Sequence, residues 1–277
     1  MSCCTGVNKM ELLISENDIV YLQLNCDALE DYYDSKLCYM NYEAAVKGEK
    51  VVINYGNGLC YDKETDVYFI PQPLSEEQQC FLLRCVIDAV QLKRGNLPMH
   101  TAAVSDGNKT FVIAAESGRG KSYISNKICK SFHEYDIIGD DHIIISSDYI
   151  QGNKKRRIRN INTEEYEYTK NKGLCSMNEL IFICYDYSEN ENYTVNLSGS
   201  DVSEAFAAKT AFKYLNETFV HNDISYRANV LADMNINDTY RERLLHFLNG
   251  KKAVFIHGTQ EYAVDLISCK IKTRRYL

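Results

Sequence analysis

The sequence predicts an α/β fold with a small β-rich region at its N-terminal end. The main observation is an apolar segment, Thr110–Ala115, followed by a glycine-bearing loop and a helical pattern over 121–132. A second short apolar segment, Asp136–Gly139, comes directly after that helix, as expected where strands and helices alternate. The chain has 277 residues, which is enough for one main core and one smaller appendage.

The predicted β-rich region covers residues 1–74 and consists of short segments separated by Gly, Asn and Asp. Its predicted strands are Ile19–Leu22, Lys50–Tyr55 and Val67–Ile70. Ser75, followed three residues later by Gln78, is the signature of a capped helix, which we expect to run to about Arg94. The predicted core therefore covers residues 75–277.

The remainder of the core is expected to continue the alternation of strands and helices. We predict strands at Ile143–Ile145, Leu180–Tyr185, Ala253–His257 and Ala263–Ile267, helices at Val202–Phe219 and Asp238–Leu248, and a polar loop at Ser188–Thr194.

The composition, with 45% hydrophobic and 25% charged residues, is typical of a globular protein. No apolar stretch approaches the ~18 residues that a membrane span requires. The first residues lack the basic and apolar regions of an export signal, so we expect a cytoplasmic protein without a membrane partner. The 11 cysteines are scattered, mostly in apolar segments, and we expect reduced thiols and no metal on cysteine.

The net charge of −7 argues against a general nucleic-acid partner. One short segment departs from this balance. Its basic residues are Lys154, Lys155, Arg156, Arg157 and Arg159. Such a run is typical of a solvated loop or hairpin. The alternative is that it attracts an acidic protein, an acidic peptide or a phosphorylated substrate.

The loop Ala115–Ser122 matches the pattern of a phosphate-binding loop, with Ala in place of the usual first Gly. Glycines are needed where successive backbone N–H groups converge on phosphate oxygens, and Gly118 and Gly120 supply that freedom. The helix that begins near Lys121 directs its positive end and the lysine ammonium toward the same phosphates. Ser122 offers a hydroxyl to magnesium. We therefore predict a bound nucleoside triphosphate, ATP, together with Mg²⁺.

The whole loop contributes to the predicted nucleotide contacts. The predicted nucleotide-binding residues are Glu116, Ser117, Gly118, Arg119, Gly120, Lys121, Ser122 and Tyr123. Glu116 has the wrong charge for a phosphate, so we expect its side chain to point toward solvent. Arg119 has two interpretations, which stay open: contact with the transferred phosphoryl group, or a place on the surface.

Two adjacent aspartates, Asp140 and Asp141, end the apolar strand at Gly139, and Asp140 lies 18 residues beyond Ser122. Phosphoryl transfer needs carboxylates that hold magnesium and that orient or deprotonate the acceptor hydroxyl. Because the intervening helix returns the chain to the neighbouring strand, we expect both carboxylates near the phosphates. The alternative is a pair of solvated aspartates in a turn.

Four features together resemble the HPr kinase/phosphorylase family and its smaller relatives, including kinases encoded beside modified peptides. They are Leu97–His100 before a strand, the loop Glu116–Ser122, the segment Ile138–His142, and the short spacing between these motifs. They cover residues 97–145, roughly a sixth of the chain. The resemblance implies a nucleotide-binding core of the type shared with phosphoenolpyruvate carboxykinase. The phosphorylase-specific segment of the family is not recognisable, so the resemblance does not extend to phosphorolysis, hexameric assembly or HPr itself as the substrate.

The resemblance also implies roles for single residues. Asp140 matches the acid/base partner of the acceptor hydroxyl, Asp141 matches a residue that supports the metal and the loop, and His100 matches a residue beside the phosphates. His142 is a weaker candidate. The family's later magnesium-binding Glu stands in a glycine-containing motif that is not found cleanly here, and Glu179 is its substitute, with Glu164 and Glu165 behind it. The implied catalytic residues are Asp140, His100 and Lys121, and the implied metal ligands are Ser122, Asp141 and Glu179.

These observations predict an ATP-dependent kinase that transfers the γ-phosphoryl group to a Ser or Thr hydroxyl of a protein or peptide. Two alternatives stay open. One is a kinase of small hydroxyl compounds, and the other is a nucleotide-binding module or ATPase whose occupancy drives an interaction.

Overall fold

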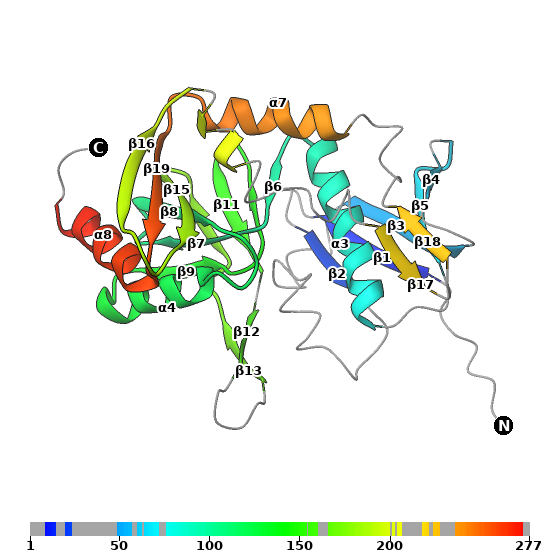
Figure 1. Ribbon diagram of the computed structural model, residues 1–277. Helices are drawn as coiled ribbons and strands as arrows, with labels where there is room; N and C mark the ends of the chain where they lie inside the picture. Colours follow the sequence, from blue (N-terminus) through cyan, green and yellow to red (C-terminus); the bar gives the residue numbers. More distant parts are fainter. Residues whose placement is uncertain are drawn as a thin grey trace.

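The structure is a computed structural model, drawn in Figure 1 with its helices and strands labelled. It describes residues 9–14, 20–23, 49–56, 60–62, 64–71, 76–153, 155–159, 166–199, 201–202, 204–206, 218–221, 224–227 and 236–273. No helix in these segments is long and apolar enough to cross a membrane.

A six-stranded mixed sheet forms the centre of the core, with the strand order β16-β19-β15-β8-β7-β9. Its strands are β7 (Thr101–Ser105), β8 (Lys109–Ala114), β9 (Asp136–Gly139), β15 (Glu179–Tyr187), β16 (Tyr193–Leu197) and β19 (Lys252–Gly258). Strands β8, β15 and β19 are parallel, and β7 pairs antiparallel with both β8 and β9. Strands β8 and β9 therefore run in the same direction, so their carboxyl ends lie at one edge of the sheet. The predicted α/β fold is confirmed.

The central strands β8 and β15 are buried on both faces of the sheet, and their side chains alternate between the two faces. The helices around the core are α3 (Glu76–Lys93), α4 (Lys121–Ser131), α7 (Ile236–Leu248) and α8 (Gln260–Lys272). On β8, Phe111 and Ile113 belong to the apolar cluster that includes α4 and α8. Val112 and Ala114 belong to a second cluster, which includes α3 and α7. Figure 1 shows α4 and α8 together on one side of the sheet.

A second, antiparallel sheet adds to the α3 side of the core, with the strand order β14-β11-β10-β6. Its strands are β6 (Leu97–Met99), β10 (Ile143–Ile145), β11 (Tyr149–Gly152) and β14 (Leu174–Ser176). The basic segment follows β11 and forms a hairpin of β12 (Lys155–Arg159) and β13 (Tyr166–Lys170), which projects from the core in Figure 1. The hairpin interpretation of this charge run is confirmed.

Two glycines bring the ends of β9 and β11 into direct backbone contact. A Cβ atom on Gly152 would overlap the Cα of Gly139 and the carbonyl oxygen of Ile138. The backbone cannot yield as a flexible side chain can, so each of these positions requires glycine. The contact matters for the site because β9 leads directly into Asp140.

We expect Gly152→Ala to lower the free energy of unfolding by about 3 kcal/mol, the upper part of the range for overpacking a filled interior. Chemical denaturation measures the change. Gly107→Ala is the matched control: a Cβ there meets nothing within 4 Å, and only its φ of +92° opposes the substitution, at a cost of about 1 kcal/mol. A Gly152→Ala protein as stable as the control would contradict the packing described here.

The strand predicted at Ala263–Ile267 is wrong, because these residues lie within helix α8. Thr259 caps this helix, and its hydroxyl accepts a hydrogen bond from the Tyr262 amide at 3.1 Å. Ala263 and Ile267, four residues apart, are both completely buried on one face of the helix. A short apolar run does not distinguish a strand from a buried helical turn, whereas a threonine cap does.

Two further boundaries differ from the predictions. The predicted helix Val202–Phe219 does not reach its predicted end, because Phe219 lies in β17 (Thr218–His221), which forms a hairpin with β18 (Ile224–Arg227). The predicted loop Ser188–Thr194 is too long, because Thr194 lies in β16 and pairs with β19. Strand β16 is an exposed edge strand, and its polar residues Thr194 and Asn196 resemble those of a loop in the sequence.

The predicted N-terminal sheet is present, with the strand order β2-β1-β3-β5-β4. Its strands are β1 (Lys9–Ile14), β2 (Val20–Gln23), β3 (Glu49–Gly56), β4 (Cys60–Asp62) and β5 (Val67–Pro71). Strands β1 and β4 were not predicted. The β4–β5 hairpin packs against α3 through buried Tyr68, and Lys93 of α3 donates to the Tyr61 hydroxyl at 2.7 Å. Ser75, the predicted cap of α3, lies outside the described residues.

Candidate nucleotide site

The predicted phosphate loop connects β8 to α4 and has the backbone conformation that requires glycine. Gly118 and Gly120 have φ angles of +75° and +105°, which side chains other than hydrogen rarely allow. Gly120 is the N-cap residue of α4, and no side chain caps the helix. The first turn of α4 also contains no acidic residue. This helix end therefore has amides and a partial positive charge suited to an anion.

Lys121 lies at the centre of the loop and is buried, with 6% of its surface exposed. Its ammonium donates hydrogen bonds to the carbonyl oxygens of Ala115 at 2.8 Å and Glu116 at 3.2 Å. The loop is thus wrapped around its own lysine. These two bonds hold the ammonium at the centre of the loop.

Asp140 lies beside the loop, as predicted. The Ser122 hydroxyl donates to Oδ1 of Asp140 at 2.9 Å, and the Asp140 amide donates to the side-chain oxygen of Asn153 at 3.0 Å. Burial raises the pKa of the Asp140 carboxyl, and the nearby Asp141 charge raises it further. Ser122, Arg156 and Lys121 oppose that shift. A buried carboxyl with a raised pKa next to a phosphate loop is suited to accepting a proton.

The route from the loop to Asp140 differs from the prediction in one respect. We expected β9 to be the immediate neighbour of β8, but β7 lies between them. The carboxyl ends of β8 and β9 still lie at the same edge of the sheet, because β7 is antiparallel to both strands, so β8 and β9 run in the same direction. The two carboxyl ends remain close enough for the contact between Ser122 and Asp140.

Asp141 joins a cluster of cationic and imidazole groups. Arg84 of α3 donates to the Asp141 backbone carbonyl at 2.8 Å, and the nearest oxygen of the Asp141 carboxylate is 3.5 Å from the same guanidinium. Nε2 of His100 lies 3.4 Å from the other carboxylate oxygen. Asp141 has a φ angle of +76°, a left-handed conformation that costs a non-glycine residue free energy. The contacts with Arg84 stabilise this strained turn.

The two histidines of the predicted set have different surroundings. Burial lowers the pKa of His100 to about 3, and the charges of Lys121 and Arg84 also lower it, so this imidazole is neutral at ordinary pH. His142 is also buried, and its Nε2 lies 2.8 Å from the carboxylate of Asp88 on α3. His142 therefore connects the aspartate turn to α3, whereas His100 is close enough to Lys121 to be influenced by its charge.

The other predicted loop residues lie at the periphery. Glu116 and Arg119 are half exposed and form a surface pair, with 3.7 Å between Nε of Arg119 and the glutamate oxygen. This pair confirms the expectation that Glu116 faces solvent, and it places Arg119 beside Glu116 on the surface. The Tyr123 hydroxyl donates to Glu261 of α8 at 3.0 Å, so its side chain joins α4 to α8. The exposed Ser117 lies between Glu116 and Gly118 in the loop.

Glu179, which was predicted as a metal ligand, is not part of this constellation. It opens β15 and pairs with Lys109, the first residue of the parallel strand β8. The phosphate loop follows the other end of β8, about 17 Å away at the usual rise per residue of a strand. Glu179 instead lies 3.9 Å from the Lys109 ammonium, with 43% of its side chain exposed. Its alternatives, Glu164 and Glu165, lie outside the described residues.

The fit of Mg²⁺ to the remaining residues depends on oxygen ligands. Within the described part of the chain, no group of three or more His, Cys, Asp or Glu residues is arranged to hold a metal. Magnesium at nucleotide sites needs fewer protein ligands, since it is usually held by one or two side chains, phosphates and water. Ser122 and Asp140 supply hard oxygen atoms 2.9 Å apart at the phosphate loop and fit this requirement.

Sequence reasoning missed the residues that support Asp140 and Asp141 from other elements. They are Arg84, Asp88, Asn153 and Arg156. The available signal was on α3, where Arg84 and Asp88 stand four residues apart in an otherwise apolar stretch and are both buried. Charged residues in a buried stripe need partners, and here the partners are Asp141 and His142.

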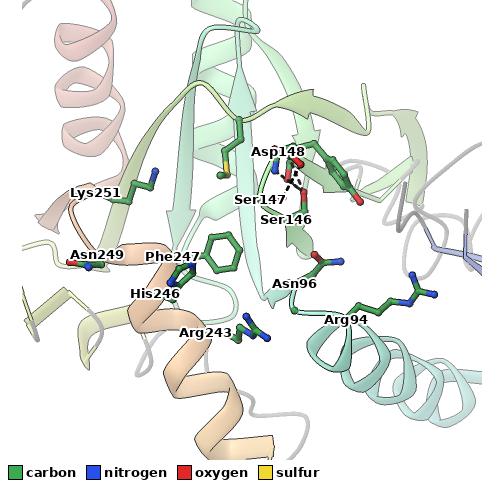
Figure 2. Close-up of a pocket in the computed structure, with 13 residues that line it drawn as sticks. Arg94, Asn96, Ser146, Ser147, Asp148, Arg243, His246, Phe247, Asn249 and Lys251 are labelled. Atoms are coloured by element: carbon green, nitrogen blue, oxygen red, sulfur yellow. Dashed lines mark hydrogen bonds between the residues drawn. The ribbon is translucent and has the colours of Figure 1, made fainter. Parts of the chain in front are cut away.

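A large cavity of about 700 Å³ lies at the opposite edge of the core. Figure 2 shows its walls: Arg243, His246 and Phe247 at the end of α7, and the turn Ser146–Asp148. Lys251, which also lines it, precedes the amino end of β19, whereas the carboxyl end of β19 leads to α8 beside the phosphate loop. The cavity is therefore separate from the candidate nucleotide site.

Comparison with known proteins does not assign this chain to a family. No protein-family model matches the sequence, and no curated protein matches it.

Proposed function

We propose that this chain is an ATP-dependent kinase, which transfers the γ-phosphoryl group to a Ser or Thr hydroxyl of a protein or peptide. The observation that carries the proposal is the hydrogen bond from Ser122, in the phosphate loop, to the buried carboxylate of Asp140. It joins a site for phosphates to a group that can take a proton. The core is proposed to be of the type that HPr kinase shares with phosphoenolpyruvate carboxykinase.

In the proposed reaction, the oxygen of the acceptor hydroxyl forms a bond to the γ-phosphorus. The bond between that phosphorus and the bridging oxygen breaks, and its electron pair leaves with ADP. The acceptor proton passes to Asp140, whose raised pKa suits it to hold a proton. Lys121 and the amides of the loop neutralise charge on the phosphates.

The remaining residues of the proposed site hold these groups in place. Mg²⁺, held by the Ser122 hydroxyl, would neutralise phosphate charge and align the γ-phosphoryl group. Arg84 and His100 hold Asp141, and the turn of Asp140 and Asp141 is connected to α3. His100 stays neutral at working pH, so it can donate or accept one hydrogen bond without adding charge.

The proposal is tested by incubating the protein with Mg²⁺ and ATP labelled at the γ-phosphate, together with Ser/Thr peptide libraries or small hydroxyl compounds. Label in peptide Ser or Thr is the expected result. Label only in a small compound favours a small-molecule kinase, and release of labelled phosphate alone favours an ATPase. ATP binding with no transfer and no hydrolysis favours a regulatory module, and any of these three results overturns the proposal.

A further inference from the structure

We propose that Arg156, on the basic hairpin, binds the phosphoryl group during its transfer. The inference rests on the proposed kinase function and assigns to the hairpin a role that the charge run alone does not imply. Three features of the described residues support this role: the root of the hairpin, the environment of the Arg156 guanidinium, and the position of the guanidinium relative to Asp140.

The root of the hairpin is attached directly to Asp140. Asn153, which precedes β12, accepts a hydrogen bond from the Asp140 amide at 3.0 Å and donates to the Lys155 carbonyl at 2.8 Å. On the other side of the root, Asn171 follows β13 and donates to the Asn153 carbonyl at 2.9 Å. The glycine contact between the ends of β9 and β11 lies at the same place. The base of the hairpin is therefore held rigidly against the aspartate turn.

Two nitrogen atoms of the Arg156 guanidinium are buried without the hydrogen bonds that burial normally requires. Among the described residues, its Nε and Nη1 atoms are buried and have no hydrogen-bond partner. Leaving charged donors unsatisfied is costly, and native proteins usually avoid it unless the site has a function. Arginine presents a fork of donors whose geometry matches phosphate oxygens.

Arg156 lies close to Asp140 and also to Cys129 of α4, because its charge lowers the pKa of both groups. Asp140 raises the pKa of Arg156, and the Arg156 charge lowers the pKa of Asp140 more than the Lys121 charge does. The guanidinium is thus near the carboxylate that faces Ser122 and the phosphate loop. A phosphoryl group in transit between ADP and an acceptor spreads negative charge over its equatorial oxygens. Arg156 supplies the opposite charge there, while the bonds form and break as described for the proposed reaction.

The test compares Arg156→Gln with Lys170→Gln, which removes the same charge from an exposed residue of the same hairpin. We expect Arg156→Gln to slow transfer by roughly 10²–10³-fold and to change the affinity for ADP less than threefold. In the wild type, aluminium fluoride should tighten binding of Mg–ADP, because it imitates the transferred group. That tightening should be lost in Arg156→Gln and partly kept in Arg156→Lys. Lys170→Gln should behave as the wild type does.

Two outcomes distinguish this inference from the proposed function. If the wild type transfers phosphate and Arg156→Gln does so equally well, Arg156 has no such role, although the kinase proposal stands. If the wild type binds no nucleotide, the kinase proposal itself fails. Because Nε and Nη1 make no hydrogen bonds among the described residues, we expect Arg156→Gln to melt at or above the wild-type temperature. A large drop in melting temperature would show that the guanidinium is structural.

An independent observation supports a second proposal: the cavity in Figure 2 binds a small organic anion. Its volume of about 700 Å³ is that of a ligand pocket. The charged side chains that line it are Arg94, Arg243, His246, Lys251 and Asp148. The charge is thus positive in a chain whose net charge is −7. Of the residues that line the cavity, only Asp148 is acidic, and its carboxylate accepts a hydrogen bond from the Ser147 hydroxyl at 2.8 Å.

The pocket also offers an apolar surface and a fixed cation. Phe247 and Met177 line it beside the charged groups, so an anion with an attached ring fits its chemistry. The Arg243 guanidinium packs on Gly95, where an added Cβ would come within 3.3 Å of it. Basic residues at helix ends also stabilise the helix dipole, and this is the explanation that the experiment has to exclude.

Phenyl phosphate is the probe, titrated into Lys121→Ala protein so that the phosphate loop contributes little. We expect saturable binding, weakened about tenfold or more by Arg243→Gln or by Lys251→Gln. Lys130→Gln, an exposed change on α4, is the control and should leave binding unchanged. Absence of saturable binding, or equal weakening by the control, overturns the proposal. Lower stability of Arg243→Gln with unchanged binding would assign the cation to the helix end alone.

Discussion

Replacing Asp140 with asparagine is expected to leave ATP bound and to slow phosphoryl transfer by roughly 10²–10⁴-fold, the usual contribution of a positioned general base. Asparagine keeps the shape of the side chain and can still accept the Ser122 hydrogen bond, but it cannot take the acceptor proton. Nucleotide titration and single-turnover transfer measure the two effects separately. The wild-type rate should fall as the pH drops through the raised pKa of Asp140, because only the ionised carboxylate accepts a proton.

The same substitution has a predictable effect on stability. The pKa of Asp140 is higher in the folded protein than in the unfolded chain, so the fold disfavours the ionised form. Protonated Asp140 contributes its full stability below a pH of about 3.9, the pKa of an aspartate in the unfolded chain. This contribution is lost as the pH rises through the higher pKa of Asp140 in the folded protein. At neutral pH, Asp140→Asn should therefore unfold at the same or a higher denaturant concentration than the wild type. Below the unfolded pKa the difference should disappear.

Glu179→Gln is the matched control for Asp140→Asn, since it also neutralises one carboxylate. Glu179 lies at the opposite end of the parallel strands, so we expect normal ATP binding and normal transfer. Normal turnover by Asp140→Asn would remove Asp140 from the proposed mechanism. Loss of transfer in Glu179→Gln would reinstate it as a participant.

Replacing Lys121 with alanine is expected to weaken ATP binding by about tenfold to a hundredfold, the equivalent of one charged hydrogen bond, and to impair transfer as well. The loss has two causes. The ammonium no longer meets the phosphates, and the carbonyl groups of Ala115 and Glu116 lose the donor around which the loop is folded.

Calorimetric titration of ATP measures the effect of Lys121→Ala. Lys127→Ala is the control, because Lys127 also lies on α4 but is exposed, with its ammonium over the ring of Tyr123. Equal ATP affinity in the wild type and in Lys121→Ala would mean that the loop does not hold the phosphates.

The loop Ala115–Ser122 and the strand before it were predictable because their signals are local. A buried strand appears in the sequence as an apolar run. The left-handed backbone angles of Gly118 and Gly120 require glycine, independently of the tertiary contacts. Helix α8 was wrongly predicted as a strand, because its local pattern is ambiguous. Its short apolar core, Ala263–Ile267, suits a strand equally well, and only the cap by Thr259 distinguishes the two.

By itself, the sequence determined the α/β class, the strand, loop and helix around Lys121, and the position of Asp140 at a strand end. Only the tertiary structure decided which distant groups meet there. In the structure, Glu179 lies away from the site, and β7 lies between β8 and β9. Arg84, Asn153 and Arg156 lie close to the turn of Asp140 and Asp141. The physical reason is that backbone conformation depends on neighbours along the chain. Contacts between charges depend instead on strand order and direction, which no single segment encodes.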